Sequence, residues 1–430
     1  MNQMSYSGIE WIGNIPSTWN LIKTKYCFVN KKYIPGKLSK NYQRLALTLS
    51  GVIIRNKEDT EGLQPKDFDS YQLVNEGNLV FKLIDLQNIS TSRVGLSFYT
   101  GLVSPAYIVL QKLTSSSINL KFSEYYFLMM WFRSIFNELG DNGVRSSLSA
   151  NDLLNIYICV PPIKEQNKIA KFLDGKCAEI DSLVADIQKE ISILEEYKKS
   201  VITESVTKGI VQNVEMKNSG INWIGKIPKT WTISRLKFLL KKKMKYGASE
   251  TGVDYSAELP RYVRITDILP NNKLKEENKL SLTKEQSKGF ILEDGTVLFA
   301  RSGGTVGKTF LYNSQMGVAA YAGYLISAIA NSCVLLPEWL FYFSLSSSYL
   351  TWVELIFSQS TIQNINADKY SNMPLTLPPI EEQKSICSFL KKACSEIDKA
   401  ISEKQSQLDL LAEYKKSLIY EYVTGKKEVI

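Results

Sequence analysis

The 430-residue sequence contains no histidine. Histidine is the commonest general base and metal ligand in proteins, so its absence excludes Ser-His and Cys-His nucleophile systems and disfavours an enzyme. No Cys-x-x-Cys pair is present either, because the six cysteines are scattered. Their spacing argues against a zinc site or a disulfide framework, and it favours reduced thiols in a bacterial or archaeal cytoplasm. The cysteines are Cys27, Cys159, Cys177, Cys333, Cys387 and Cys394.

Long hydrophobic runs are also lacking. No stretch approaches the roughly 18 uncharged apolar residues of a transmembrane helix, and the first residues show no basic region followed by an apolar run. We therefore expect neither a membrane span nor a signal peptide. The 44% hydrophobic and 22% charged residues are ordinary for a globular chain of two or three domains.

The net charge of +9 is unevenly distributed. Residues 1–160 carry 16 Lys/Arg against 12 Asp/Glu (+4), and residues 214–377 carry 19 against 13 (+6). Residues 161–213 carry 8 against 9 (−1), and residues 378–430 carry 9 against 9 (0). Two basic blocks thus alternate with two neutral ones. A polyanionic partner of the basic blocks would explain this, although so small an excess also occurs on ordinary surfaces.

A tandem repeat organises the chain. Ser7-Gly8-Ile9-x-Trp11-Ile12-Gly13-x-Ile15-Pro16-x-Thr18-Trp19 returns 212 residues later, ending at Trp231. Pro161-Pro162-Ile163-x-Glu165-Gln166 and Glu196-Tyr197-Lys198-Lys199-Ser200 both return 217 residues later. Such self-similarity indicates two copies of one structural unit. For Trp11, Trp19, Trp223 and Trp231 we favour packing in a core over a partner surface.

Each copy has two parts. Short apolar runs punctuated by Gly, Asn and Pro predict strands and turns in the first part. These runs are Leu79–Phe81, Tyr107–Leu110, Tyr262–Ile265 and Thr296–Phe299, with helices expected near Glu124–Leu139 and Glu338–Phe357. We expect mixed α/β domains at residues 1–160 and 212–377. The second part, residues 161–211 and 378–430, is predicted to be one long helix in each copy.

The predicted helices carry an apolar stripe at steps of three and four, which a helix uses to pack against a partner helix. The residues predicted to pack are Ile180, Val184, Ile187, Ile191, Leu194, Ile397, Ile401, Leu408 and Leu411. Tyr197 and Tyr414 continue the stripe, whereas Lys404 interrupts it. Alone, such a helix is typical of a coiled-coil dimerisation segment. Its duplication allows the two helices to pair within one chain as an antiparallel coiled coil and to hold two domains at a set distance.

Two divergent basic domains on a helical spacer suit the reading of two separated patches of DNA. The repeated motifs, together with Asp294-Gly295-Thr296-Val297-Leu298-Phe299-Ala300-Arg301-Ser302-Gly303, resemble the specificity subunits of type I restriction–modification systems. The resemblance covers nearly the whole chain and implies an α+β fold with a pseudo-two-fold repeat: two target recognition domains alternating with two conserved helices. The implied function is recognition of a bipartite, asymmetric DNA target.

The resemblance also implies partners and their cofactors. Two adenine methyltransferase subunits would bind the conserved parts and carry S-adenosylmethionine, and an ATP- and magnesium-dependent motor/nuclease subunit would join for restriction. This chain would bind double-stranded DNA, no membrane and no cofactor of its own. One departure is that the first domain has Glu76-Gly77-Asn78-Leu79-Val80-Phe81-Lys82 and no Arg-Ser-Gly-Gly stretch. The two halves therefore need not read DNA with matching residues.

Arginine and amide side chains are the usual readers of base edges, and glycine-rich loops bring backbone N–H groups close to phosphates. On this basis the DNA-binding candidates of the first domain are Lys82, Arg93 and Arg145. Those of the second domain are Arg264, Arg301, Ser302, Gly303, Lys308, Gln363 and Asn364. A tight turn with two solvated cations is an equal alternative for Arg301–Lys308. The run Lys241–Lys245 fits phosphate steering or a plainly solvated surface.

Three features that superficially suggest catalysis do not support it. Arg301–Lys308 lacks the first glycine of a phosphate-binding loop. The double prolines have apolar neighbours, without the polar group that would hold an exocyclic amine. The Glu-x-Lys pairs at Glu196 and Glu413 lie within helices, where residues two apart do not converge. We expect no catalytic residue and no metal site in this chain. The alternative to a DNA reader is a non-enzymatic coiled-coil adaptor with duplicated binding domains.

Overall fold

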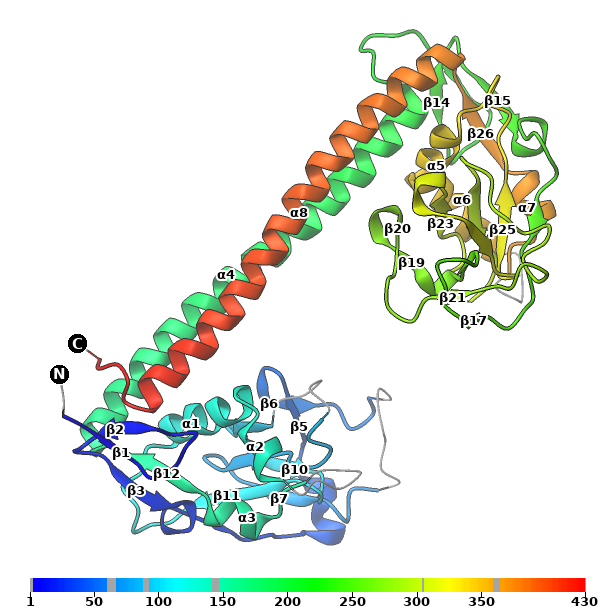
Figure 1. The fold of residues 1–430 in the computed structure, drawn as a ribbon. Coiled ribbons are helices and arrows are strands. Elements are labelled where there is room, and N and C mark those ends of the chain that lie inside the picture. The colour runs from blue at the N-terminus through cyan, green and yellow to red at the C-terminus, as the bar shows by residue number, and fades with distance from the viewer. Residues whose placement is uncertain are drawn as a thin grey trace. The chain divides into compact units, whose positions relative to one another are not determined.

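The computed structural model describes residues 3–59, 67–87, 93–140, 147–303, 305–358 and 364–429. The chain forms two compact units, Met1–Asp186 with Gln407–Ile430 and Ile187–Ser406, here called unit 1 and unit 2. Each unit consists of one mixed domain and a part of each of two long helices (Figure 1). The predicted fold class is confirmed.

The described part of the domain in unit 1 contains two four-stranded sheets. One is antiparallel throughout, in the order β4 (Phe28–Asn30), β11 (Ile108–Lys112), β8 (Leu79–Phe81), β9 (Val94–Leu96). The other has the order β6 (Gly51–Arg55), β5 (Arg44–Thr48), β10 (Gly101–Val103), β7 (Gln72–Val74), with only β5 and β10 parallel. Two short pairs complete it: β1 (Met4–Tyr6) with β2 (Asn14–Pro16), and β3 (Asn20–Lys23) with β12 (Tyr157–Val160).

The helices of this domain are α1 (Leu120–Phe132), α2 (Ile135–Leu139) and α3 (Ala150–Asn155). The helix expected near Glu124–Leu139 starts earlier, because the Asn119 side chain accepts a hydrogen bond from the Phe122 N–H and caps α1. It also breaks in two, because Ser134 has a left-handed backbone (φ 59°) between α1 and α2.

The domain in unit 2 repeats this plan. Its antiparallel sheet has the order β16 (Lys245–Tyr246), β25 (Leu325–Ala328), β22 (Val297–Ala300), β23 (Thr309–Leu311). A second sheet has the order β17 (Val253–Asp254), β21 (Leu280–Ser281), β18 (Arg261–Val263), β24 (Ala319–Tyr321), with β18 and β24 parallel. The short pairs are β13 (Met216–Asn218) with β14 (Lys226–Pro228), β15 (Thr232–Arg235) with β26 (Pro374–Leu377), and β19 (Ile268–Leu269) with β20 (Lys273–Leu274).

The helices of this second domain are α5 (Pro337–Leu345), α6 (Ser347–Ser358) and α7 (Ala367–Ser371). The single helix expected near Glu338–Phe357 is thus two helices, because Ser346 between them is extended (ψ 155°). Both domains end with a short helix and a strand that lead into a long helix, which is the order the repeat predicts.

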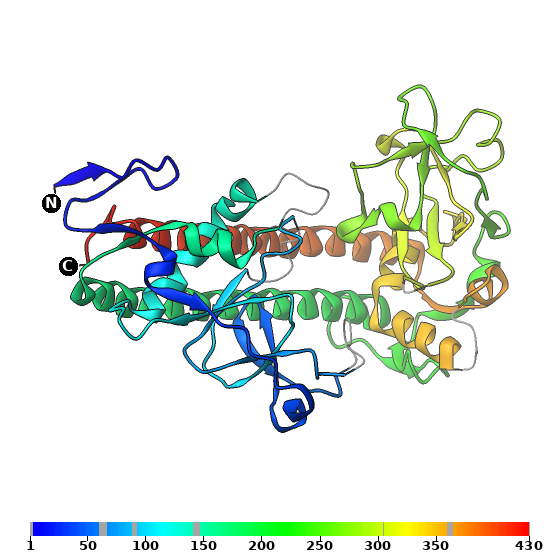
Figure 2. The same ribbon diagram turned by 90° about the horizontal axis from the view of Figure 1, so that it is seen from below.

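The two long helices are α4 (Ile163–Lys208) and α8 (Ile380–Val423). In each unit they lie side by side, as all views show (Figures 1 and 2). Among the described residues, no helix is long and apolar enough to cross a membrane.

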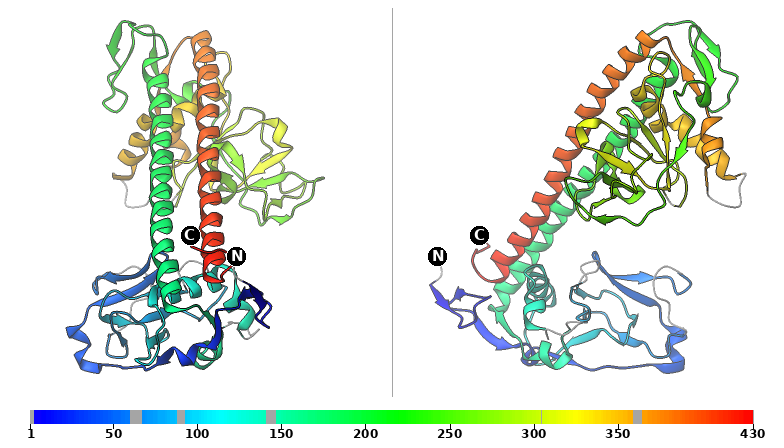
Figure 3. Two further views of the ribbon diagram at one scale, coloured as in Figure 1. Left: turned by 90° about the vertical axis from the view of Figure 1, so that its left-hand side faces the viewer. Right: turned by 45° about the vertical axis from the view of Figure 1, so that its right-hand side comes forward.

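The repeated tryptophan motif receives the end of a long helix. In unit 1, Gly425 follows α8 with a positive φ of 70°, and a Cβ there would lie 2.4 Å from Pro16 and 3.1 Å from the Trp19 ring. Lys426 then donates hydrogen bonds to the carbonyls of Ile12 and Asn14, so the segment that follows α8 lies against residues 12–14 (Figure 3). In unit 2, Gly209 follows α4 (φ 80°) against the Trp231 ring. Glycine allows this backbone conformation and the close approach to the ring. Trp19 and Trp231, 5% and 0% exposed, are packing residues, as favoured above.

The repeated Pro-Pro-Ile-x-Glu-Gln motif joins domain to helix. Gln383 is fully buried; its side-chain amide donates to the carbonyls of Val334 (2.9 Å) and Pro378 (3.0 Å) and accepts from the Leu336 N–H (2.9 Å). Gln166 does the same in unit 1, donating to Pro161 and accepting from Asn119. The motif therefore has a structural role that satisfies backbone groups at the helix entry.

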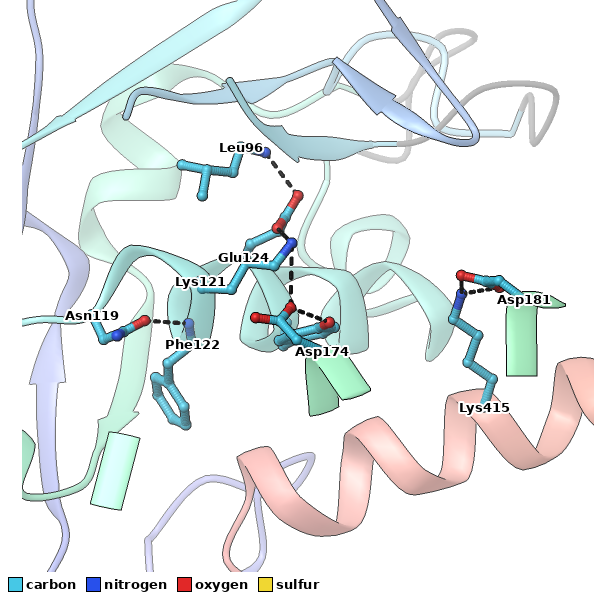
Figure 4. Close-up of polar contacts among 9 residues, drawn as sticks. Leu96, Asn119, Lys121, Phe122, Glu124, Asp174, Asp181 and Lys415 are labelled. Atoms are coloured by element: carbon cyan, nitrogen blue, oxygen red, sulfur yellow. Dashed lines mark hydrogen bonds and ion pairs between the residues drawn. The ribbon is translucent and has the colours of Figure 1, made fainter. Parts of the chain in front are cut away.

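A polar network strengthens this joint in unit 1 (Figure 4). The buried Glu124 of α1 accepts a hydrogen bond from the Leu96 N–H of β9 (2.8 Å) and pairs with Lys121 (2.8 Å). Lys121 and the Tyr125 hydroxyl both reach Asp174 of α4, at 3.6 and 2.8 Å. Burial alone would lower the pKa of Lys121, but the carboxylates of Glu124 and Asp174 outweigh it and raise the pKa. The network thus fixes α4 to its domain through charge-assisted bonds.

Replacing Gln383 by alanine should lower the free energy of unfolding by about 1–3 kcal/mol, because three backbone groups at the helix entry, one buried and two half-buried, lose their partner. The measurement is urea unfolding of the full chain. Gln405→Ala, at an exposed position of the same helix, is the matched control and should change little. Equal stability of the two variants would contradict the structural role of the motif.

Candidate nucleic-acid interface

Reciprocal ion pairs fix the pairing of the long helices. In unit 1, Lys415 of α8 pairs with Asp181 of α4 at 2.6 Å. In unit 2, Lys198 of α4 pairs with Asp398 of α8 at 2.7 Å. Lys198 and Lys415 are equivalent in the repeat, as are Asp181 and Asp398, since both pairs of positions differ by 217. The same two positions of the repeat therefore form the contact in both units, as in an isologous interface.

The helices are antiparallel in each unit. In unit 1, the tilted rings of Phe172 and Tyr422 pack with centroids 4.5 Å apart, while the later Asp181 meets the earlier Lys415. In unit 2, Glu190 pairs with Lys404 at 2.5 Å, and the later Lys198 meets the earlier Asp398. Lys404, which interrupts the apolar stripe, thus gains a carboxylate partner.

The predicted stripe lies on the inner side of the helices. All nine predicted packing residues are buried or half-buried, from Ile180 at 5% and Ile397 at 8% exposed to the half-buried Val184, Ile187, Ile191, Leu194, Ile401, Leu408 and Leu411. The extension of the stripe to Tyr197 and Tyr414 is wrong, because these rings are 58% and 54% exposed. The next residue, Lys198 or Lys415, takes the inward position instead and makes the ion pair described above.

In unit 2 the candidate residues cluster after the buried strand β22. The Arg301 N–H donates to the Tyr324 carbonyl (3.0 Å), and the Arg301 carbonyl accepts from the Ile365 N–H (2.9 Å). Ser302 forms a β-bridge with Asn364. Gly303 has a positive φ of 77°, which reverses the chain at this point. The backbone therefore brings Arg301, Ser302 and Asn364 together.

The guanidinium of Arg301 has no charged partner among the described residues. It lies over the rings of Tyr246 and Tyr324, with centroids at 5.0 and 6.0 Å. Its Nε atom is buried without a hydrogen bond, and so is Oδ1 of Asn364. Arg301 also borders an open pocket of about 340 Å³, shared with Glu250, Tyr262 and the exposed Tyr324. An oriented but unsatisfied arginine beside an amide can form hydrogen bonds with base edges.

Two other cations of this domain are already engaged. Arg264 holds Asp267 through two hydrogen bonds (3.0 and 2.7 Å) and donates to the Asn278 carbonyl. The hydrogen bonds to Asp267 raise the pKa of Arg264. The Lys308 ammonium donates to the Ile268 carbonyl. We therefore leave Arg264 and Lys308 out of the candidate interface. Gln363 lies outside the described residues.

The two described candidates of unit 1, Lys82 and Arg93, do not form an equivalent site. Arg93 is 1% exposed and donates to the carbonyls of Lys82 (3.3 Å), Ile84 (3.1 Å) and Asp85 (2.7 Å). It stabilises the turn after β8, where Asp85 has a positive φ of 52°. A side chain this buried cannot contact DNA without unfolding the turn, so Arg93 is a structural residue. Lys82 is half-buried; burial and the charge of Arg93 lower its pKa. Arg145 lies outside the described residues.

Equivalent backbone positions show how the two domains differ. The Leu83 carbonyl accepts from the Leu148 N–H (2.9 Å), as the Arg301 carbonyl accepts from the Ile365 N–H. Leu83 thus occupies the place of Arg301, and it is 1% exposed. One domain carries a buried leucine where the other carries an available arginine.

One exposed basic segment of the first domain was not among the residues predicted from the sequence to bind DNA. Lys31, Lys32, Lys37 and Lys40 lie within ten residues and are all exposed. Lys32 is held by a hydrogen bond to the Pro105 carbonyl (2.8 Å), and the segment also carries the exposed Tyr33 and Leu38. The density of lysines was the available signal, and it suits contact with phosphates.

The comparisons with known proteins point to one family. The model of the type I restriction modification DNA specificity domain matches residues 23–192 and 228–407, which is more than half of the chain. Each match lies within one copy of the repeat, and together they confirm the resemblance stated from the motifs.

Similar proteins include specificity subunits of type I restriction enzymes. A protein of Methanocaldococcus jannaschii, provisionally named as the type I restriction enzyme MjaX specificity subunit, is 24% identical over 97% of this chain and 96% of its own length. The MjaVIII specificity subunit of the same organism is 26% identical over 64% and 63% of the two chains. A chain from a solved structure on complex assembly and conformational transition of the type I R-M system aligns with a TM-score of 0.67 at 15% identity, over 96% and 99% of the two chains. At that identity the likeness shows the fold alone.

A charge-reversal cycle tests the pairing of the helices. Lys198→Glu should lower the free energy of unfolding by about 1 kcal/mol, because it sets two carboxylates together, and Asp398→Lys in the same chain should restore most of it. Denaturant unfolding of the full chain gives both values. Lys199→Glu, at the exposed neighbouring position, is the control. Absence of rescue in the double variant would refute the pair as a stabilising contact.

Proposed function

Because this chain belongs to the family of type I restriction modification DNA specificity domains, we propose that each of its two recognition domains reads one half of a bipartite, asymmetric DNA target. The chain is a specificity subunit with two DNA recognition domains, and its relatives carry that name. The domains would be held apart by α4 and α8, which set the gap between the half-sites.

One observation supports the proposal that the two half-sites of the DNA target differ. The Arg301 guanidinium lies over two tyrosine rings and its Nε atom has no hydrogen-bond partner, whereas the equivalent Leu83 is buried. Two domains with different residues at the same backbone position present different hydrogen-bonding groups to DNA. We infer that the second half-site is read through Arg301, with Ser302, Gly303 and Asn364 beside it, and that the first half-site is read by other groups.

The proposed partners are two adenine methyltransferase subunits, one for each unit. Each unit offers an equivalent apolar pair one helical turn apart: Leu410 and Tyr414 in unit 1, Ile193 and Tyr197 in unit 2. Their exposed fractions are 70% and 54%, and 54% and 58%. Duplicated exposed apolar residues suit a partner present in two copies.

The chemistry would reside on these partners. S-adenosylmethionine would bind to the methyltransferase subunits, and ATP with magnesium to a motor/nuclease subunit in a complex that also restricts DNA. This chain would bind no cofactor, contribute no catalytic residue and act in the cytoplasm of its bacterial or archaeal host. The competing function, an adaptor that never touches DNA, predicts no salt-dependent affinity for duplex DNA.

The test is sequencing of methylated adenines in DNA from cells that express this chain with its methyltransferase subunit. We expect a split motif with a fixed gap. Inserting four residues after Leu194 and four after Ile401 adds one turn to each helix of the pair, about 6 Å, and should lengthen the gap by one or two base pairs. Insertion after Leu194 alone, which breaks the helix register, is the control. An unchanged gap in the double insertion would refute the spacer role.

Arg301→Ala should relax the choice of base at one position of one half-site and weaken binding about 5- to 150-fold, because a base-edge contact is lost. The other half-site and the gap should stay the same. Lys288→Ala, an exposed cation of the same domain, is the matched control. A variant that keeps the complete motif would show that Arg301 does not read a base.

A further inference from the structure

Both domains display an aromatic ring at the same place in the repeat. A 3-10 turn follows β3 in unit 1 (Thr24–Tyr26) and β15 in unit 2 (Leu236–Phe238), and both strands can be followed in Figure 1. Tyr26 is 63% and Phe238 is 69% exposed. The two rings are 212 residues apart, the same offset as Trp19 and Trp231.

The exposure of the two rings does not result from a loosely held backbone. Thr24 is fully buried, and its N–H and hydroxyl both donate to the Ile156 carbonyl (2.8 and 3.0 Å). Leu236 is also fully buried and donates to the Met373 carbonyl (2.9 Å). Each turn is therefore fixed to the residue that precedes the strand leading into a long helix, and it presents its ring from a rigid position.

Cations flank both rings. The ammonium of Lys25 lies 5.7 Å from the Tyr26 ring centroid, and that of Lys237 lies 5.2 Å from the Phe238 ring centroid. A further cation, Lys23 or Arg235, comes two residues earlier. The repeated pattern is thus cation, buried residue, cation, exposed ring. A partner that fits it has an apolar pocket rimmed by carboxylates.

The difference between the two copies shows which property of the ring is common to both. Tyrosine in one and phenylalanine in the other retain the ring but not the hydroxyl, so the apolar face is the shared property. The residues at the proposed base-reading position, Leu83 and Arg301, share no property at all. A feature kept in both domains while the reading position diverges suits a partner that is the same on both sides.

We propose that Tyr26 and Phe238 are equivalent anchors, each inserted into one of two copies of the same methyltransferase subunit. The identity of that partner rests on the function proposed above. Contact of these segments with the DNA backbone is the rival arrangement, but phosphates are bound through cations and hydrogen-bond donors, and the ring of phenylalanine supplies neither. Aromatic side chains are instead enriched at protein interfaces, where a few residues supply most of the binding energy.

Native mass spectrometry of the co-expressed complex tests the proposal. The unaltered chain should carry two methyltransferase subunits, Tyr26→Ala and Phe238→Ala one each, and the double variant none. The affinity of the altered site should fall about 30-fold or more, as for an interface anchor. Tyr26→Phe and Phe238→Tyr should retain both partners. Tyr33→Ala and Tyr255→Ala remove exposed rings from the same two domains and should leave two partners bound.

The DNA affinity of the same variants, measured against salt, separates the outcomes. Unchanged DNA binding with lost partners supports the proposal. Two partners retained by the double variant, with weaker DNA binding on every sequence and a smaller salt dependence, would assign the rings to the DNA backbone and overturn it. Failure of the unaltered chain to bind the methyltransferase subunit would instead contradict the proposed function.

Discussion

The architecture depends on the self-complementary pairing of α4 with α8. Asp181 meets Lys415 in one unit, and the equivalent Asp398 meets the equivalent Lys198 in the other. Each copy of the helix packs against the other copy, so equivalent residues form the contact in both units. A substitution in one copy alters one of these contacts, and both are altered only when the equivalent residue is replaced as well. This constraint explains why the motifs at the helices and their entries are duplicated, whereas the sequences between them have diverged.

The same pairing determines how the domains close. Each unit is completed by the end of the other copy's helix: α8 ends on Trp19, and α4 ends on Trp231. The core of unit 1 thus includes Leu418, Ile419 and Val423, hundreds of residues from the strands they cover. Burial of these apolar side chains couples the folding of each domain to the correct pairing of its helix. The first domain alone would expose that part of its core.

The sequence predicted the features that local signals encode and missed those that depend on distant residues. Repeats, heptad spacing and glycine or proline punctuation are local signals, and they predicted the fold class, the two long helices and the family correctly, whereas the helices expected near Glu124–Leu139 and Glu338–Phe357 are each two helices. Tyr197 and Tyr414 were misplaced because the apolar residue and the neighbouring lysine fit the helical period almost equally, and only the position of Asp398 or Asp181 decides between them. Arg93 was misread because charge alone does not show that three carbonyls surround the guanidinium.

The two copies of the repeat can differ most readily at positions that do not contact each other. Glu190 and Lys404 pair in unit 2, yet their counterparts in the repeat are Gln407 and Ile187, which cannot form an ion pair. The pairing of α4 with α8 therefore tolerates an ion pair in one unit that has no equivalent in the other. Leu83 and Arg301 each lie within their own domain, outside the contact between α4 and α8, so the helix pairing does not require them to agree. A homodimer would force identical readers on both half-sites, whereas a duplicated chain can keep a symmetric frame and still recognise an asymmetric target.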